Sequence, residues 1–282
     1  MTQYREQIMQ AVFFLAACTS ILAVALICLF ILGNGVPAML EIGLPAFLLG
    51  KTWRPSNNLY GVLPMILGSV YVTTGAILIG VPVGILTAVF MAEFCPPELY
   101  RFLKPCVELL AGIPSVVYGF FGLLVFVPWI RETLGGSGSS ILTASLLLGI
   151  MILPTIIGVS ESAIRAVPQS YYEGGLALGA SHERSVFFVV LPAAKSGVWA
   201  GIILGIGRAI GETMAVIMVA GNQPRMPKGL LKGVRTLTAN VVIEMGYAAD
   251  LHREALIATA VLLFLFILMI NLSFARLKRM ND

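Results

Sequence analysis

Two opposite charges stand in the middle of an otherwise apolar stretch of the sequence. Arg208 and Glu212 lie four residues apart, in a run from Ser196 to Asn222 that has no other charge. Residues with this spacing share one face of a helix. A charge in the middle of a membrane costs about 2.5–3.5 kcal/mol on insertion scales, so it persists where it is paired or faces a cavity. Two hypotheses stay open: a structural ion pair, or a pathway for an ion.

The chemistry of this pair suits an oxyanion. A guanidinium presents a planar fork of N–H donors that matches phosphate oxygens, and it stays charged when desolvated. The Glu212 carboxylate can accept a hydrogen bond from a protonated oxygen. Phosphate near neutral pH keeps at least one hydroxyl, whereas sulfate has none. We therefore hypothesise that Arg208 attracts the anion and that Glu212 selects its protonated form.

The composition of the chain places these charges in a membrane. Of its 282 residues, 58% are hydrophobic and 11% are charged, whereas soluble domains carry about 45–50% apolar and about 25% charged residues. Such a chain cannot cover itself with a polar surface, which excludes a cytosolic enzyme, a disordered chain and a secreted disulfide scaffold. The net charge of +4 comes with no basic helix face, so nucleic acid is excluded as a partner.

Six apolar segments are long enough to cross a bilayer, since a spanning helix needs about 20 mostly apolar residues. They are Ala11–Leu32, Val62–Met91, Leu109–Ile130, Ile141–Ser160, Ser196–Asn222 and Ala255–Phe274. The sequence therefore predicts an all-α polytopic membrane protein with six transmembrane helices. We expect residues 1–60 to form an N-terminal helix and an extracytoplasmic loop, and residues 61–282 to form a core of five helices. The basic cluster Arg276, Lys278 and Arg279 favours cytoplasmic termini.

Two polar segments between the spans are long enough to have a function. In residues 161–195, Ser170 and Glu173 have the spacing of a capping box. Gly179 is placed to end that helix, and Ser181 is placed to cap a second one. In residues 221–254, an amphipathic helix is predicted by apolar residues at steps of three and four, namely Val234, Leu237, Val241 and Met245. Either segment can be a plain connection, a helical knob or a cover over a pathway.

The sequence contains no recognisable set of catalytic or metal-binding residues. Gly50-Lys51-Thr52 ends like a nucleotide-binding P-loop, but Pro45 occupies the position of its first glycine. His182 and His252 are isolated along the chain, so neither is interpreted as a metal ligand. We therefore predict no enzyme activity, no metal and no cofactor.

The segment 161–195 resembles the EAA loop of binding-protein-dependent ABC importer permeases. That loop reads Glu-Ala-Ala, three residues, Gly, nine residues, Ile-x-Leu-Pro. At the same spacing this chain has Glu173-Gly174-Gly175, Gly179 and Val189-x-Leu191-Pro192. The resemblance implies that the loop is cytoplasmic and that four of its residues couple the permease to an ATPase: Glu173, Gly179, Leu191 and Pro192. The two glycines that replace alanines each cost about 1 kcal/mol in a helix interior, which predicts a softer helix.

A second motif is similar to the PstC-type permease subunits of phosphate importers. It runs from Gly207 to Val216, and the blocks Arg235–Asn240 and Glu244–Tyr247 resemble these subunits as well. The resemblance implies a type I ABC importer permease bundle in the plasma (inner) membrane of a prokaryote. It also implies a substrate pathway along the motif, with Arg208, Glu212 and Thr213 as its residues.

The same resemblance implies the partners. They are a PstA-like permease subunit, two ABC ATPase subunits that use the ATP, an extracytoplasmic phosphate-binding protein, inorganic phosphate and membrane lipid. Several alternatives stay open, including another oxyanion as the substrate and the PstA-type half of the importer. A self-contained anion channel or carrier is a third alternative, although such a protein would need no coupling loop.

Overall fold

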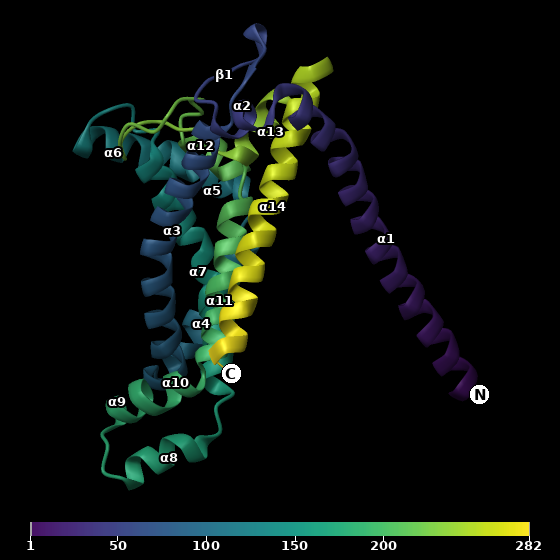
Figure 1. The fold of residues 1–282 in the computed structure, drawn as a ribbon. Helices are drawn as coiled ribbons and strands as arrows, with labels where there is room; N and C mark the ends of the chain where they lie inside the picture. The colour runs from purple at the N-terminus through teal and green to yellow at the C-terminus, as the bar shows by residue number, and fades with distance from the viewer. Residues whose placement is uncertain (1, 282) are drawn as a thin grey trace.

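A computed structural model describes residues 2–281 of the chain, and the side chains of residues 6–272 and 276. Apart from α1, the long helices run side by side and form a bundle, and short elements gather at its two ends (Figure 1). The long helices are α1 (Thr2–Ile42), α3 (Leu63–Val89), α4 (Pro97–Gly112), α7 (Ile141–Arg165), α11 (Lys195–Gly211) and α14 (Asp250–Asn281).

The short elements mark the two ends of the bundle. One end, called the hairpin end below, carries α2 (Leu44–Leu49), the paired strands β1 (Trp53–Arg54) and β2 (Leu59–Tyr60), α6 (Val127–Leu134), α12 (Met214–Val219) and α13 (Leu237–Glu244). The opposite end, called the α8 end, carries α8 (Gln169–Ala177), α9 (His182–Ser185) and α10 (Leu191–Ala193). Between α4 and α6 lies α5 (Ser115–Phe121). A 3-10 helical turn, Pro55–Asn57, connects β1 to β2, and single π-helical turns occupy Phe90–Phe94, Gly122–Phe126 and Val186–Val190.

In the part of the chain that the structure describes, five helical segments are long and apolar enough to cross a membrane. They are Glu6–Ile42, Leu63–Phe94, Ser115–Leu134, Ile141–Arg165 and Asp250–Leu272. A sixth candidate is the pair His182–Ala193 and Lys195–Gly211, which is bent by 71°. The all-α polytopic fold is therefore confirmed. The predicted fifth span is wrong in its second half, because α11 ends at Gly211 and a separate helix, α12, follows.

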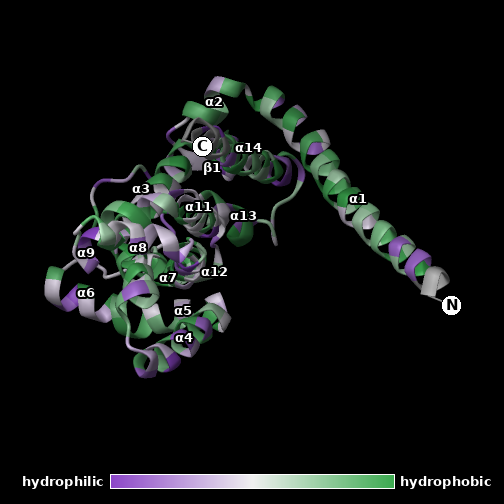
Figure 2. Ribbon diagram, turned by 90° about the horizontal axis from the view of Figure 1, so that it is seen from below, coloured by the Kyte–Doolittle hydropathy of each residue, from purple (hydrophilic) through white to green (hydrophobic). Residues whose placement is uncertain are grey.

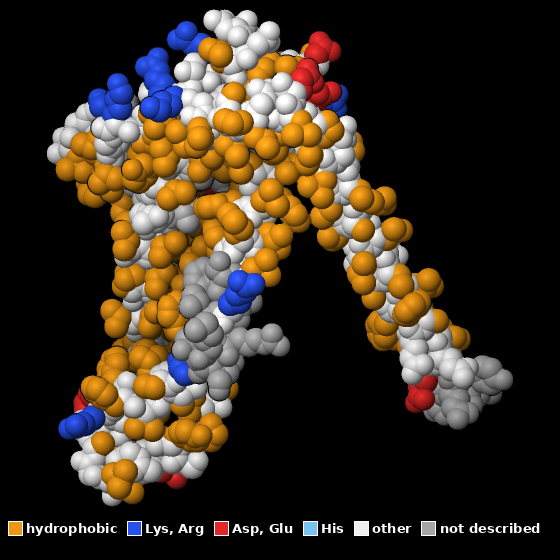
Figure 3. Space-filling view, viewed as in Figure 1, with side chains coloured by type: hydrophobic (Ala, Val, Ile, Leu, Met, Phe, Trp, Pro, Cys, Tyr) orange, Lys and Arg blue, Asp and Glu red, His pale blue; other side chains and the backbone are white. Residues whose placement is uncertain are grey.

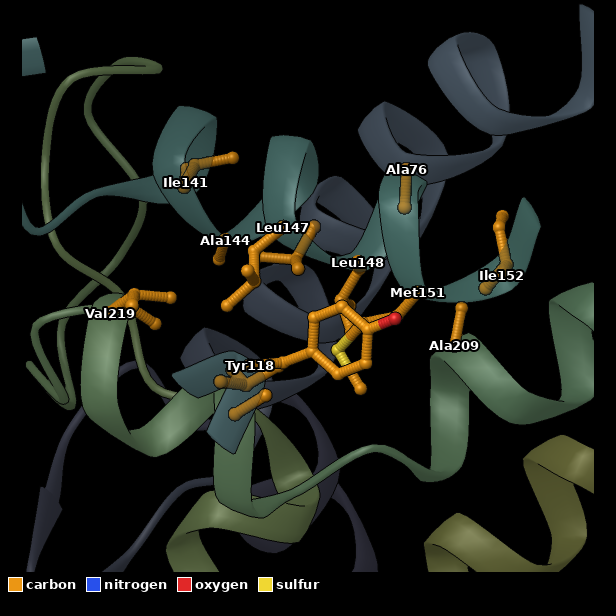
Figure 4. Packing of buried hydrophobic residues seen from close by; sticks show 14 of the residues in the cluster. Ala76, Tyr118, Ile141, Ala144, Leu147, Leu148, Met151, Ile152, Ala209 and Val219 are labelled. Atoms are coloured by element: carbon orange, nitrogen blue, oxygen red, sulfur yellow. The ribbon is translucent and has the colours of Figure 1, made fainter. Parts of the chain in front are cut away.

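The core of the bundle surrounds α7, which packs against α3 and α11. Its side chains Ala144, Leu147, Leu148 and Met151 are at most 1% exposed. Figure 4 shows Tyr118 of α5 and Ala209 of α11 lying against these α7 residues. The Ser145 hydroxyl also donates a 3.1 Å hydrogen bond to the carbonyl of Val72 on α3. This buried helix is the fixed element from which the two ends of the bundle are positioned.

Helix α1 contacts the bundle at only one of its ends. Near the hairpin end, Ala38 and Met39 are buried against Ala255 and Leu256 of α14. Further toward the N-terminus α1 diverges from the bundle, and its most apolar 18-residue window is 0% buried (Figures 1 and 2). The exposed side chains of α1 are therefore available to lipid or to another subunit.

The predicted amphipathic helix of residues 221–254 is present but shorter than the pattern suggested. It is α13, which begins at Leu237 because the Thr236 hydroxyl accepts a 3.2 Å hydrogen bond from the Ala239 N–H. Val234 lies outside the helix and is fully buried, where its backbone pairs with Gly221. Of the basic cluster that favours cytoplasmic termini, the structure describes the side chain of Arg276 only, because those of Lys278 and Arg279 lie outside the described residues.

Candidate substrate pathway and coupling site

The helix that carries Arg208 ends before Glu212, so the helical backbone is interrupted between the two predicted pathway charges. Arg208 lies in the last turn of α11, but Glu212 follows its end with an extended backbone (φ −69°, ψ 128°). The two residues therefore do not share a continuous helical face, which corrects the prediction. Among the residues that the structure describes, no ion pair joins them.

Glu212 stabilises this break. Its Oε1 atom accepts hydrogen bonds from the backbone N–H groups of Thr213 (3.1 Å) and Ala215 (3.2 Å), which caps the start of α12. Its backbone carbonyl accepts a 3.2 Å hydrogen bond from the Thr238 hydroxyl of α13. The Thr213 hydroxyl donates to the carbonyl of Gly211 at 3.2 Å. Glu212 and Thr213 thus hold the local backbone, and Oε2 of Glu212 is left without a partner in the described part of the chain.

Arg208 is different, because its guanidinium has no hydrogen-bond or ion-pair partner among the described residues. Its side chain is half-buried. A half-buried cation with five unused N–H donors is suited to bind an anion.

The predicted coupling loop forms a helical knob at the α8 end. Gly179 ends the first helix as expected: its φ is +85°, and its N–H donates to the Leu176 carbonyl at 2.9 Å. Ser181 caps α9 as expected, since its hydroxyl accepts from the Arg184 N–H at 3.3 Å. The predicted cap at Ser170 is wrong, because Pro168 occupies the N-cap position and Ser170 lies inside the first turn of α8.

The knob presents exposed side chains outward and is attached to the bundle by aromatic contacts. Glu173 is exposed, and Leu178 is 92% exposed. Leu191 and Pro192 follow in α10, next to the start of α11. His182, which the sequence left isolated, accepts or donates a 2.9 Å hydrogen bond with the Tyr172 hydroxyl and packs 4.6 Å from the ring of Phe94, which ends the π-helical turn after α3. The knob is thus in contact with the turn that follows α3, and α10 connects it directly to α11.

The two glycines of the knob differ in what surrounds them. A Cβ on Gly175 would lie 2.7 Å from the Ser185 hydroxyl, whereas a Cβ on Gly174 would meet nothing within 4 Å. Gly175 is therefore needed for the close contact between α8 and the helix that follows it. Gly174 is an exposed helical glycine.

This difference predicts opposite results for two matched substitutions. We expect Gly174→Ala to stabilise α8 by about 1 kcal/mol, the difference in helix propensity between the two residues. Gly175→Ala should loosen α8, because its methyl group displaces Ser185. Amide hydrogen exchange of residues 169–178 measures both effects, and equal protection in the two variants would contradict the assigned contact.

A buried carboxylate holds the bundle together next to the knob. Glu161 of α7 is 1% exposed and accepts hydrogen bonds from the Tyr100 hydroxyl (2.6 Å), Lys104 Nζ (2.7 Å) and Arg165 Nε (2.9 Å). Arg165 also donates to the Met91 carbonyl at 2.7 Å and lies 4.4 Å from the centre of the Tyr100 ring. The turn after α3, the first half of α4 and the end of α7 are thus joined, and α7 ends at Arg165, four residues before α8 begins. Sequence reasoning missed this cluster.

A second buried cluster joins the elements of the hairpin end. Glu244 of α13 accepts from Trp53 Nε1 (2.8 Å), lies 2.8 Å from His252 Nε2 and pairs with Arg235. Arg235 also donates to Asn240 Oδ1 at 3.0 Å. Burial raises the pKa of Glu244, but the hydrogen bonds from Trp53, His252 and Arg235 outweigh burial and hold the pKa below its usual value. This carboxylate fastens β1, α13 and α14 to each other.

Chains of two solved ABC transporters have a similar fold, although their sequences are under 25% identical to this chain, so the likeness concerns the fold alone. One is from the MetNI methionine ABC transporter (TM-score 0.65, 19% identity, 82% of this chain and 100% of that chain). The other is from a bacterial ABC transporter involved in the import of alginate (TM-score 0.60, 14% identity, 93% and 95%).

Sequence comparison identifies the family. Residues 80–281 match the binding-protein-dependent transport system inner membrane component, and the chain belongs to this family. It is 40% identical over 241 residues to the probable ABC transporter permease protein YqgH of Bacillus subtilis (82% of this chain, 78% of the relative). It is 35% identical over 257 residues to the phosphate transport system permease protein PstC of Mesorhizobium japonicum (84% and 78%).

Family membership establishes the general role of the chain. It is a multi-pass inner membrane permease subunit that works with an ATPase and a binding protein. Subunits of this kind are not catalytic and have no cofactor.

Proposed function

We propose that this chain is the PstC-like half of a phosphate importer, and that Arg208 is its anion contact. The observation that carries the proposal is the half-buried guanidinium of Arg208 at the break between α11 and α12, which has no hydrogen-bond or ion-pair partner among the described residues. The relatives named as PstC support phosphate as the substrate. In the proposed importer the other permease is PstA-like, two ATPase subunits supply the energy, and a phosphate-binding protein delivers the anion.

The proposed orientation places the α8 end in the cytoplasm and the hairpin end outside. A knob with exposed Leu178 and Glu173 suits the groove of an ATPase subunit, because an apolar anchor beside a charged rim is typical of a protein interface. Residues Gly179, Leu191 and Pro192 shape the knob and its connection to α11. Both termini are then cytoplasmic. In this proposal the chain consists of an N-terminal part, 1–60, and a permease core, 61–282.

Glu212 has a revised role in this proposal. Its Oε1 atom holds the helix break, and its Oε2 atom remains to accept a hydrogen bond from a protonated substrate oxygen. We assign Thr213 to the pathway because it lies in the same break between α11 and α12. Energy from ATP moves the two permeases between outward- and inward-facing states, and no covalent chemistry occurs in this chain.

ATP-dependent uptake of labelled phosphate into vesicles tests the proposal. The vesicles contain the chain with its permease, ATPase and binding-protein partners, and sulfate and molybdate compete for uptake. We expect phosphate to be transported and sulfate to compete poorly. Efficient transport of sulfate or molybdate in place of phosphate would overturn the substrate assignment.

The variant Glu212→Gln tests the selectivity within the same assay. Glutamine keeps an oxygen that can cap α12, but its NH₂ group donates where the carboxylate accepts. We expect competition by sulfate to rise about tenfold, equivalent to about 1.4 kcal/mol. Unchanged discrimination between the anions would remove Glu212 from the selection step.

A further inference from the structure

A cationic face covers one part of the hairpin end and has no role in the pathway described above. It is defined by Arg225, Lys228 and Lys232, which are all exposed and line one hollow of about 350 Å³. Figure 3 shows basic side chains gathered at this end, over α6 and the loop that follows α12. From Met214 to Ile243 the sequence contains no Asp or Glu. The positive charge of this face is therefore not neutralised within its own segment.

The loop that carries the cationic face is fixed on the bundle. The carbonyls of Lys232 and Leu230 accept hydrogen bonds from the N–H groups of Ile141 (3.1 Å) and Leu142 (2.9 Å) at the start of α7. The Val234 N–H donates to the Ala220 carbonyl at 2.9 Å. The loop thus satisfies backbone donors at the start of α7 that would otherwise lack partners. Its three cations extend from a backbone held in a defined position.

The charge of the hairpin end is asymmetric. Exposed Glu41, Asp250 and Glu254 belong to the end of α1 and the start of α14, and a fourth exposed acidic residue, Glu132, lies beside Arg131 in α6. Figure 3 shows acidic side chains on the side of α1 and α14 and basic side chains on the opposite side. A partner with an acidic patch is attracted to one half of this end and repelled from the other, which favours one orientation of docking.

Because the three cations are exposed, this face is better suited to bind an acidic protein surface than a single small anion. Exposed ion pairs contribute about 0–1 kcal/mol each, so this face would hold a single small anion weakly. Several like charges fixed on one surface attract a large acidic surface over distances near the Debye length and speed its association. The hollow between the cations also has room for a projecting side chain.

We propose that the cationic face of Arg225, Lys228 and Lys232 is the docking contact for an acidic patch on the importer's binding protein. Importers of this family depend on such a protein. The inference rests on the proposed orientation, in which the hairpin end faces outward. The acidic half formed by Glu41, Asp250 and Glu254 then sets which lobe of the binding protein lies over the cations.

Charge reversal tests the docking contact in the reconstituted importer. The probe is the purified binding protein that supports uptake by this importer, and its affinity is measured for wild type and for Lys228→Glu with Lys232→Glu. We expect the Kd to rise about tenfold at low ionic strength, mainly through slower association. The difference should disappear at about 1 M salt, where the Debye length is about 3 Å. Raising the binding-protein concentration should restore uptake.

Arg253→Glu is the matched control, because Arg253 is exposed at the same end but lies in the acidic half, next to Glu254. We expect this variant to bind the protein as wild type does. Equal affinity of wild type and the double variant at low salt would overturn the docking contact. An equal loss in the control would also overturn it, since the effect would then follow net charge rather than the cationic face.

A separate labelling experiment distinguishes failure of the orientation from failure of the docking contact. Lys228→Cys, in a chain whose four native cysteines are replaced by serine, is treated in intact cells with a membrane-impermeant thiol reagent. We expect labelling from outside. Labelling only after the cells are opened would overturn the proposed orientation and, with it, the docking contact.

Discussion

Replacing Arg208 with glutamine is expected to lower phosphate uptake about 10–100-fold, because a hydrogen bond to a charged group contributes about 1.5–3 kcal/mol. The importer should still assemble and hydrolyse ATP. Glutamine is about as long as the aliphatic part of the arginine side chain, but it has neither the positive charge nor the planar set of N–H donors of a guanidinium. The measurement is ATP-driven uptake of labelled phosphate, together with the unfolding temperature of the purified complex.

The unpaired state of Arg208 makes this prediction specific. No carboxylate in the described part of the chain depends on its charge, so Arg208→Gln leaves no partner uncompensated. The unfolding temperature should stay the same or rise, since a half-buried charge is removed. Arg208→Lys keeps the charge without the bidentate geometry, and we expect intermediate uptake. Wild-type uptake by the glutamine variant would show that Arg208 is structural and that phosphate transport rests on sequence similarity alone.

The sequence predicted four of the six spans well, because each is a long apolar run whose cause is local, whereas the predicted third span, Leu109–Ile130, crosses the break between α4 and α5. It missed the break at Glu212 because nothing in the local sequence forbids a helix there. The break depends on the cap that Glu212 makes for α12 and on a hydrogen bond from Thr238, which lies 26 residues further along the chain. An interaction of this kind has no periodicity, so a hydropathy pattern cannot detect it.

The two buried carboxylate clusters were missed for a similar reason. Glu161 and Lys104 are 57 residues apart in sequence, and Glu244 and Trp53 are 191 residues apart. Glu161 was read as the first residue of a polar connection, although it is buried inside α7. The blocks around Arg235 and Glu244 resembled a family motif, but the resemblance did not say that these residues contact each other. The helix ends in the knob were easier to predict, since Gly179 and Ser181 form hydrogen bonds with residues close to them in the sequence.

The other large effect is expected at Glu161. Glu161→Gln should destabilise the protein by about 3 kcal/mol, at the lower limit for removing one partner of a buried ion pair. The side chains of Lys104 and Arg165 are 30% and 44% exposed, so both cations can turn partly toward solvent, which limits the loss. Glutamine still offers an oxygen to Tyr100. The temperature of unfolding in detergent measures the change, and Glu183→Gln, an exposed change in α9, is the control.

A double-mutant cycle separates the charge effect from a simple packing defect. Lys104→Met alone should cost less than Glu161→Gln, because Arg165 still neutralises the carboxylate. Combining the two substitutions should cost less than their sum, since one cation of the uncompensated pair is then gone. Strict additivity would contradict the ion-pair account. Because Glu161 joins the bundle within a few residues of the α8 knob, its loss should also weaken the link between ATP hydrolysis and uptake. Arg208→Gln and Glu161→Gln therefore have opposite signatures: the first loses uptake with its stability retained, and the second loses stability and coupling with the anion contact intact.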